Sequence, residues 1–167
     1  ATTPVDSRVS EAMAPYWHDR FGNPHSSDHV VGWSSAEAVQ MAASSIAALV
    51  GADPDEVIFT SGATEANNLA LLGLARRAPK SRHKILVSAI EHKCVLAAAR
   101  ALKEREGFSV EIIPVDREGF VDLDALETML DSSVLVASIM AVNNEVGTIQ
   151  DLPSIARMLN LHGVLFH

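Results

Sequence analysis

Short apolar runs that read as strands alternate with stretches that read as helices through most of this 167-residue chain. The apolar runs show no alternation with polar residues, which is typical of strands that are buried on both faces of a sheet. Strands that alternate with helices predict parallel strands joined by helical crossovers. The sequence therefore predicts an α/β fold with three layers (α/β/α), in which a mainly parallel sheet lies between two layers of helices.

The predicted elements cover most of the chain after residue 35. Strands are expected at residues 57–60, 84–88, 109–114, 134–140 and 163–166. Helices are expected at residues 36–50, 66–75, 94–106, 123–130 and 154–161, with Ser34 or Ser35 as the N-cap of the first. Residues 1–20 are less regular and are expected to form an N-terminal arm, which leaves residues 21–167 as one partial domain.

Composition excludes several classes of protein. With 48% hydrophobic and 20% charged residues, the chain can bury a core and does not read as disordered. A net charge of -8 argues against a surface for nucleic acid or anionic membranes, because both require clustered Lys and Arg. The sequence shows no apolar stretch long enough to span a bilayer and no signal-peptide pattern.

The single cysteine, Cys94, excludes an internal disulfide and is typical of a reducing compartment. A cytoplasmic location is therefore expected. The chain begins at Ala1 without a methionine and stops at His167, after an apolar run. We expect that it is truncated at both ends.

A turn of small residues, TSGAT at 60–64, follows the first predicted strand and opens a helix. Such a turn directs free backbone N–H groups and the positive end of the helix dipole at one point, which suits a phosphate. Gly62 lets the backbone come close, and the hydroxyls of Ser61 and Thr64 can add hydrogen bonds. The alternative is an ordinary helix N-cap without a ligand, because Ser or Thr with an acid nearby is a common helix start.

Polar residues also follow three later strands of the predicted sheet. EHKC at 91–94 comes after strand 84–88, NNEVGT at 143–148 comes after strand 134–140, and His167 ends the last strand. Functional residues of such sheets gather beyond the carboxyl ends of the strands, so these groups predict a site at that edge. A helix cap for the first histidine and ordinary turn chemistry for the two asparagines are the alternatives.

A series of motifs occurs in the order and at the spacing of one known family. They are ATTP at 1–4, FGNPHSS at 21–27, TSGATE at 60–65, EHK at 91–93 and VNNEVG at 142–147. On these motifs the chain resembles the cysteine desulfurases of the class V aminotransferase family, which are fold-type I enzymes that use pyridoxal 5'-phosphate (PLP). The EHK and NNEVG motifs are similar to the housekeeping and nitrogen-fixation branch. The resemblance covers essentially the whole chain but less than half of a family member, and it makes residues 21–167 part of the PLP-binding large domain.

The resemblance implies an activity for the full protein. L-cysteine would become L-alanine, and the sulfur would remain as a persulfide on an enzyme cysteine for iron–sulfur cluster assembly. The implied partners are cysteine, a sulfur-acceptor protein, and either a second copy in a homodimer or a chain that carries the C-terminal half. No nucleic acid, membrane or metal is expected to bind. The alternatives are a selenocysteine lyase, another class V enzyme such as an aminotransferase or a kynureninase-like hydrolase, and a non-catalytic scaffold or binding fragment.

The resemblance also implies roles for residues of this chain. Ala63 and Thr64 would bind the PLP phosphate through a backbone N–H and a hydroxyl. His92 would stack on the cofactor ring and move protons, and it is the one catalytic candidate. Asn144 would hydrogen-bond the phenolic oxygen of PLP or the substrate carboxylate. Asn23 would line the substrate pocket or the dimer contact.

Other groups of the family active site follow the position of His167 and are not expected in this chain. They are an aspartate and a glutamine that contact PLP, the lysine of a Ser-x-His-Lys segment that forms the Schiff base, the sulfur-accepting cysteine and a substrate-binding arginine. Lys93 reads as a solvated side chain on a first helical turn, and Cys94 reads as a small buried residue. The isolated chain is therefore expected to be inactive, and an open sheet edge is expected to make it self-associate.

Overall fold

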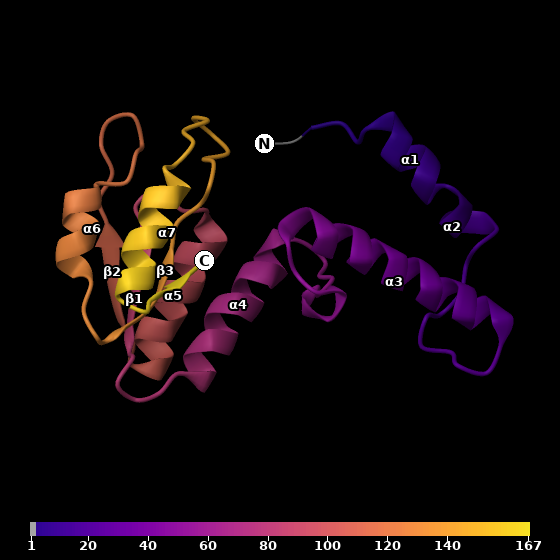
Figure 1. Ribbon diagram of the computed structural model, residues 1–167, viewed down its shortest axis with the longest axis horizontal. Coiled ribbons are helices and arrows are strands. Elements are labelled where there is room, and N and C mark those ends of the chain that lie inside the picture. The colour runs from indigo at the N-terminus through magenta and orange to yellow at the C-terminus, as the bar shows by residue number, and fades with distance from the viewer. Residues whose placement is uncertain (1–2) are drawn as a thin grey trace. The chain divides into compact units, whose positions relative to one another are not determined.

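The computed structural model describes residues 3–167. They fall into two units that divide between Phe59 and Thr60. The first unit consists of helices and turns, drawn in indigo and purple in Figure 1. Its elements are α1 (Ser7–Met13), α2 (Pro15–His18), α3 (Val30–Val50) and the short 3-10 helix η1 (Pro54–Glu56). Ala1 and Thr2 of the ATTP motif lie outside the described residues, and a domain boundary near residue 20 stays a prediction.

The start of α3 differs from the prediction. The helix begins at Val30 rather than at residue 36, and its N-cap is His29 rather than Ser34 or Ser35. The His29 ring nitrogen Nδ1 accepts a hydrogen bond of 3.1 Å from the backbone N–H of Gly32, which replaces the hydroxyl cap that the sequence suggested.

Residues 57–60 form no strand, contrary to the prediction. The sheet of the described chain contains four strands, and none of them includes this segment. An apolar run becomes a strand only where a neighbouring strand accepts and donates its backbone hydrogen bonds. Ile58 and Phe59 remain 69% and 53% exposed, which agrees with an apolar segment that no described strand covers.

The second unit has the predicted α/β fold. Its elements are α4 (Ala63–Arg77), β1 (Lys84–Ser88), α5 (Lys93–Glu106), β2 (Ser109–Ile113), α6 (Leu123–Met129), β3 (Val134–Ser138), α7 (Leu152–Leu161) and β4 (Leu165–Phe166). All strand pairs are parallel, in the order β2-β1-β3-β4. The prediction of a mainly parallel sheet is confirmed, although β3 and β4 are shorter than expected.

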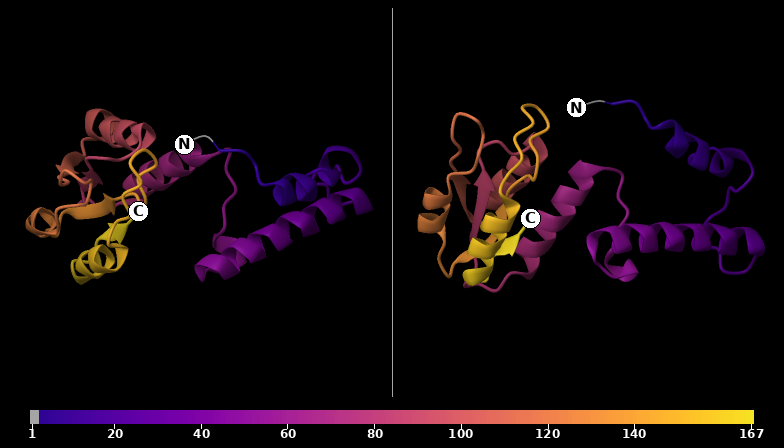
Figure 2. Two further views of the ribbon diagram at one scale, coloured as in Figure 1. Left: turned by 90° about the horizontal axis from the view of Figure 1, so that it is seen from above. Right: turned by 45° about the horizontal axis from the view of Figure 1, so that its top comes forward.

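Helices cover both faces of this sheet, as Figure 2 (left) shows with the sheet seen between α5 and α6–α7. Alternate residues of β1 point to opposite faces, so Leu86 packs on one side and Ile85 and Val87 pack on the other. On the side of Leu86, the core also contains apolar residues in or next to α6 and α7: Leu126, Leu130, Ile155 and Leu159. On the side of Ile85 and Val87, the core also contains residues of α4 and α5: Leu71, Ala75, Val95, Ala98, Ala99 and Leu102.

Among residues 3–167, none of the helices is both long and apolar enough to cross a membrane.

The strand order creates a switch point between β1 and β3. From β1 the chain passes through α5 to β2 on one side, and α6 then returns it to β3 on the other side of β1. The helices that follow β1 and β3 therefore lie on opposite faces of the sheet. In open α/β sheets, the space beyond the carboxyl ends of two such strands is where ligands bind.

Candidate active site

The N-terminus of α4 lacks the usual side-chain cap. Its N-cap is Gly62, which has no side chain and so cannot cap the helix. The φ of 155° and ψ of 179° of Gly62 belong to a region that strongly favours glycine. Within the described chain, no side chain accepts a hydrogen bond from the backbone N–H of Ala63 or Thr64. The first turn of this 15-residue helix thus presents donors and the positive end of its dipole without an internal partner.

Glu65 closes the turn that precedes α4. Its carboxylate oxygen Oε2 accepts from the backbone N–H of Ser61 at 2.6 Å and from the Ser61 hydroxyl at 2.7 Å. These two hydrogen bonds hold the pKa of Glu65 below its usual value, and the bond from the Ser61 hydroxyl has the larger effect. The Ser61 hydroxyl therefore donates to Glu65, which corrects the expectation that it is a free phosphate donor, and the hydroxyl of Thr64 is left for that role.

A cavity of about 360 Å³ lies beyond the ends of β1 and β3, at the switch point. It is lined by residues at or after the ends of β1, β3 and β4 and by one residue of α4: Asn67, Glu91, His92, Val95, Ser138, Ile139, Met140, Ala141, Leu152, Phe166 and His167. Among them, His92 is the predicted catalytic residue, and Glu91 and His167 belong to the strand-end groups from which a site was predicted. No sequence pattern pointed to Asn67 or Ser138.

Asn67 connects the start of α4 with this cavity. Its Nδ2 atom donates to the sulfur of Cys94 at 3.2 Å, which joins the beginning of α4 to the beginning of α5. Thr64 precedes Asn67 by three positions and so lies on the same face of α4, about 4.5 Å along the axis. The uncapped helix start and His92, the N-cap of α5, are therefore neighbours in the fold.

Glu91 is a buried carboxylate that joins the ends of the two central strands. The side chain is 9% exposed, and its Oε1 atom accepts from the Ser88 hydroxyl at 3.2 Å and from the backbone N–H of Met140. Since Ser88 ends β1 and Met140 follows β3, this one carboxylate bridges the two strand ends beside His92.

His167 is held by both its backbone and its ring. Its backbone N–H donates to Ala137 at 2.9 Å, its carbonyl accepts from Ile139 at 2.8 Å, and its Nδ1 lies 2.9 Å from the Ser138 hydroxyl. Burial lowers the pKa of His167, and the negative charge of Glu91 offsets part of that effect.

This lowered pKa predicts a pH-dependent stability. An imidazole whose pKa is lower in the folded state contributes stability above the unfolded value of about 6.5, and the contribution is lost as the pH falls through that value toward the folded pKa. We expect the free energy of unfolding, measured with urea between pH 7.5 and 5, to decline less steeply in His167→Asn than in the wild type. His162→Asn is the matched control, because His162 is exposed, and its slope should equal that of the wild type. Equal slopes in wild type and His167→Asn would contradict the lowered pKa of His167.

The two neighbouring asparagines after β3 differ sharply. Asn143 is 8% exposed; its Oδ1 accepts from the backbone N–H groups of Glu145 and Val146 at 2.9 and 3.0 Å, and its Nδ2 donates to the carbonyl of Ile90 at 3.1 Å. Asn143 therefore has the turn role that was the alternative for this pair. Asn144 is exposed, and its side chain makes no hydrogen bond within the described chain.

Asn23 lies in the first unit. Its Oδ1 accepts from the backbone N–H of His25 at 3.0 Å, which is ordinary turn chemistry. Its role at the substrate pocket or at the dimer contact stays a prediction.

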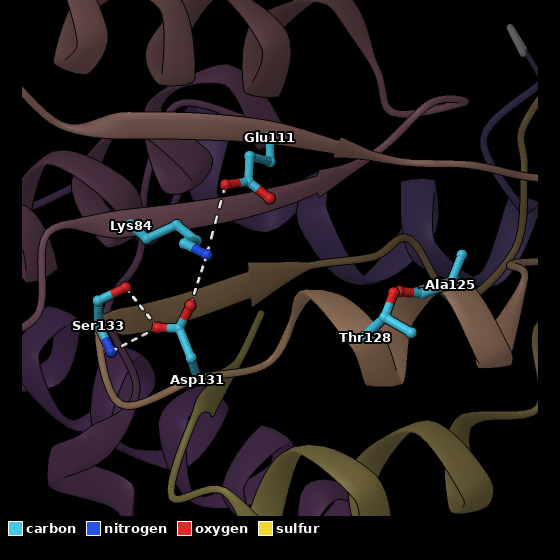
Figure 3. A network of polar contacts seen from close by, with 6 residues as sticks. All are labelled: Lys84, Glu111, Ala125, Thr128, Asp131 and Ser133. Atoms are coloured by element: carbon cyan, nitrogen blue, oxygen red, sulfur yellow. Dashed lines mark hydrogen bonds and ion pairs between the residues drawn. The ribbon is translucent and has the colours of Figure 1, made fainter.

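Lys84 ends a tetrapeptide, SRHK at 81–84, that spells the Ser-x-His-Lys pattern expected only beyond His167. Lys84 is the first residue of β1 and Ser88 is the last, about 13 Å farther along the strand. Lys84 therefore lies at the amino end of β1, away from the cavity. Its ammonium group pairs with Asp131 at 2.7 Å and with Glu111 at 3.3 Å (Figure 3). Lys84, together with Ser133, holds the pKa of Asp131 far below its usual range. Lys84 thus stabilises the base of the sheet and does not reach the candidate site.

Comparison with known proteins shows the family and the fold to which the chain is similar. The family model described as "Aminotransferase class-V" matches residues 1–167. A protein of Rickettsia felis named "Cysteine desulfurase IscS" is 47% identical over all of this chain, which spans 40% of that relative's length. Among solved structures, a "NIFS-LIKE PROTEIN" matches with a TM-score of 0.93 and 38% identity over 99% of this chain and 46% of its own.

A second solved structure is that of a complex with cysteine. "SspA in complex with cysteine" matches with a TM-score of 0.90 and 36% identity, over 99% of this chain and 47% of its own. Because the family model matches the chain from residue 1 to residue 167, the chain belongs to the class V aminotransferase family.

Proposed function

We propose that the chain is part of a PLP-dependent cysteine desulfurase. The observation that carries the proposal is the uncapped start of α4, whose free N–H groups lie beside the crevice that holds His92. The names of the relatives support the assignment, and the chain spans about 40% of the length of the first of them. The activity, substrate and partners below therefore concern the whole protein.

The residues of the site fit the cofactor. A doubly charged phosphate is matched by the N–H groups of Ala63 and Thr64, by the Thr64 hydroxyl and by the helix dipole. His92 is exposed at the crevice, where its ring would pack on the cofactor and exchange protons with the substrate. Asn144, whose amide is free within the described chain, would bind the phenolic oxygen or the substrate carboxylate. When bound, PLP supplies the electron sink for cleavage at the substrate carbon.

The remaining parts of the proposal rest on the relatives. The substrate would be L-cysteine, with L-alanine as product and the sulfur carried as a persulfide to an acceptor protein for iron–sulfur cluster assembly. A homodimer or a complementing chain would complete the site, with Asn23 at the pocket or at the dimer contact. We also propose a cytoplasmic location and a partial PLP-binding domain at residues 21–167. A selenocysteine lyase is the second candidate, since a site built for a thiol also admits a selenol.

Binding of pyridoxamine 5'-phosphate to the chain tests the cofactor site. This compound carries the phosphate but no aldehyde, so it cannot react with surface lysines. We expect it to bind more tightly than pyridoxamine in calorimetry, with amide NMR shifts at residues 62–65 and 92. Equal affinity for the two compounds would overturn the phosphate site.

The reaction is tested separately on the whole protein. Alanine and sulfide released from L-cysteine would support the desulfurase. Turnover of selenocysteine alone would support the lyase, and transfer of the amino group to a keto acid would indicate an aminotransferase.

A further inference from the structure

We propose that Cys94 is a positioning residue for His92: its thiol, held by Asn67, donates to Nδ1 of the imidazole and keeps the ring proton on Nε2. The consequence for catalysis rests on the proposed function, whereas the hydrogen-bond arrangement does not. The family resemblance and the sequence pattern gave Cys94 only the role of a small buried residue.

Three contacts place these groups in a chain. The Sγ atom of Cys94 lies 3.0 Å from Nδ1 of His92 and 3.2 Å from Nδ2 of Asn67. The backbone N–H of Cys94 also points at Nδ1 of His92, at 3.3 Å. Cys94 is half-buried between α4 and α5. Its contact with Asn67 is partly buried, whereas its two contacts with His92 are exposed.

The directions of the hydrogen bonds follow from what each group is able to donate. A backbone N–H only donates, so Nδ1 of His92 must accept from Cys94 and therefore carries no proton of its own. The thiol then has to act as the donor toward Nδ1, since two acceptors would otherwise face each other. The amide NH₂ of Asn67 donates to the sulfur, which leaves the S–H free to point at His92.

This chain of donors fixes both the tautomer and the orientation of His92. In the neutral imidazole the proton is confined to Nε2, the nitrogen that Cys94 does not contact. The ring is also held at one edge by two donors on residue 94, so its plane is set before any ligand arrives. A ring that stacks on a planar cofactor loses less orientational freedom on binding when its plane is already set.

Nitrogen-15 NMR of the histidine rings tests the arrangement in the chain without cofactor. In the wild type we expect Nδ1 of His92 to report a hydrogen-bonded acceptor and Nε2 to carry the proton. In Cys94→Ala we expect the Nδ1 resonance to shift toward that of a free acceptor nitrogen, with increased ring mobility. Cys94→Ser keeps an O–H donor and is expected to restore most of the wild-type signal.

Two variants of α4 separate this role from a general loss of packing. Asn67→Ala is expected to shift the Nδ1 resonance in the same direction, by less than Cys94→Ala, because the thiol itself remains. Asn68→Ala is the matched control, since the Asn68 amide donates to the carbonyl of Thr64 and does not touch Cys94. A proton found on Nδ1 in the wild type, or identical His92 signals in wild type and Cys94→Ala, would overturn the proposal. None of these readouts requires PLP, so they stand even if the cofactor site fails its own test.

Discussion

Replacing Ala63 with proline is expected to weaken the phosphate-dependent part of cofactor binding by roughly 10- to 100-fold while α4 stays folded. Ala63 is the first residue of the helix, a position where proline is favoured because that N–H has no helical partner. The preceding Gly62 already has the extended ψ of 179° that a residue before proline requires. The substitution therefore removes one backbone donor from the phosphate site and leaves the fold nearly unchanged.

The controls for Ala63→Pro keep the donor or remove a different one. Ala63→Ser retains the N–H and is expected to bind pyridoxamine 5'-phosphate as the wild type does. Thr64→Val removes only the hydroxyl and should have a smaller effect than Ala63→Pro. Calorimetry with pyridoxamine as the reference isolates the contribution of the phosphate. Unchanged phosphate-dependent affinity in Ala63→Pro, with helix content preserved in circular dichroism, would mean that this helix start does not bind the phosphate.

The sequence predicted the second unit well because its signals are local. Apolar strands such as 84–88 are bounded by polar residues, and each lies next to a helix with a clear start and end. The strand expected at 57–60 failed because strand pairing depends on distant segments, and no local pattern reveals whether a partner is present. The start of α3 was missed because its cap is the imidazole of His29, which lacks the hydroxyl or carboxylate that marks a typical N-cap.

The candidate site was predictable only in part, for a related reason. His92 and Thr64 follow a strand or open a helix, so their positions were visible in the sequence. The contact between Asn67 and Cys94 joins residues 27 positions apart, and the contact between Glu91 and Met140 joins residues 49 positions apart. Such pairs become evident only when the fold brings them together. Glu91 did carry a signal, since a carboxylate that lies three residues after the end of an apolar strand has to find donors once it is buried.

Removing the carboxylate of Glu91 is expected to lower the free energy of unfolding by about 1–3 kcal/mol. In Glu91→Ala the backbone N–H of Met140 and the hydroxyl of Ser88 both lose their acceptor in a region that is largely closed to water. An unsatisfied buried donor costs more than the hydrogen bond contributes, because the group has also lost its water. Glu91→Gln keeps a carbonyl oxygen in place, so its loss of stability should be less than half as large.

The same variants reveal whether Glu91 acts on the site or only on the core. Because the carboxylate joins the ends of β1 and β3, its loss should open the crevice locally before the sheet unfolds. We therefore expect amide hydrogen exchange at Met140 to accelerate more in Glu91→Ala than exchange at Val87, in the centre of β1. Urea unfolding gives the global free energy, and Glu104→Ala, a change at an exposed position of α5, should leave both measurements near the wild-type values. Equal acceleration at Met140 and Val87 would show that Glu91 stabilises the sheet as a whole and not the crevice in particular.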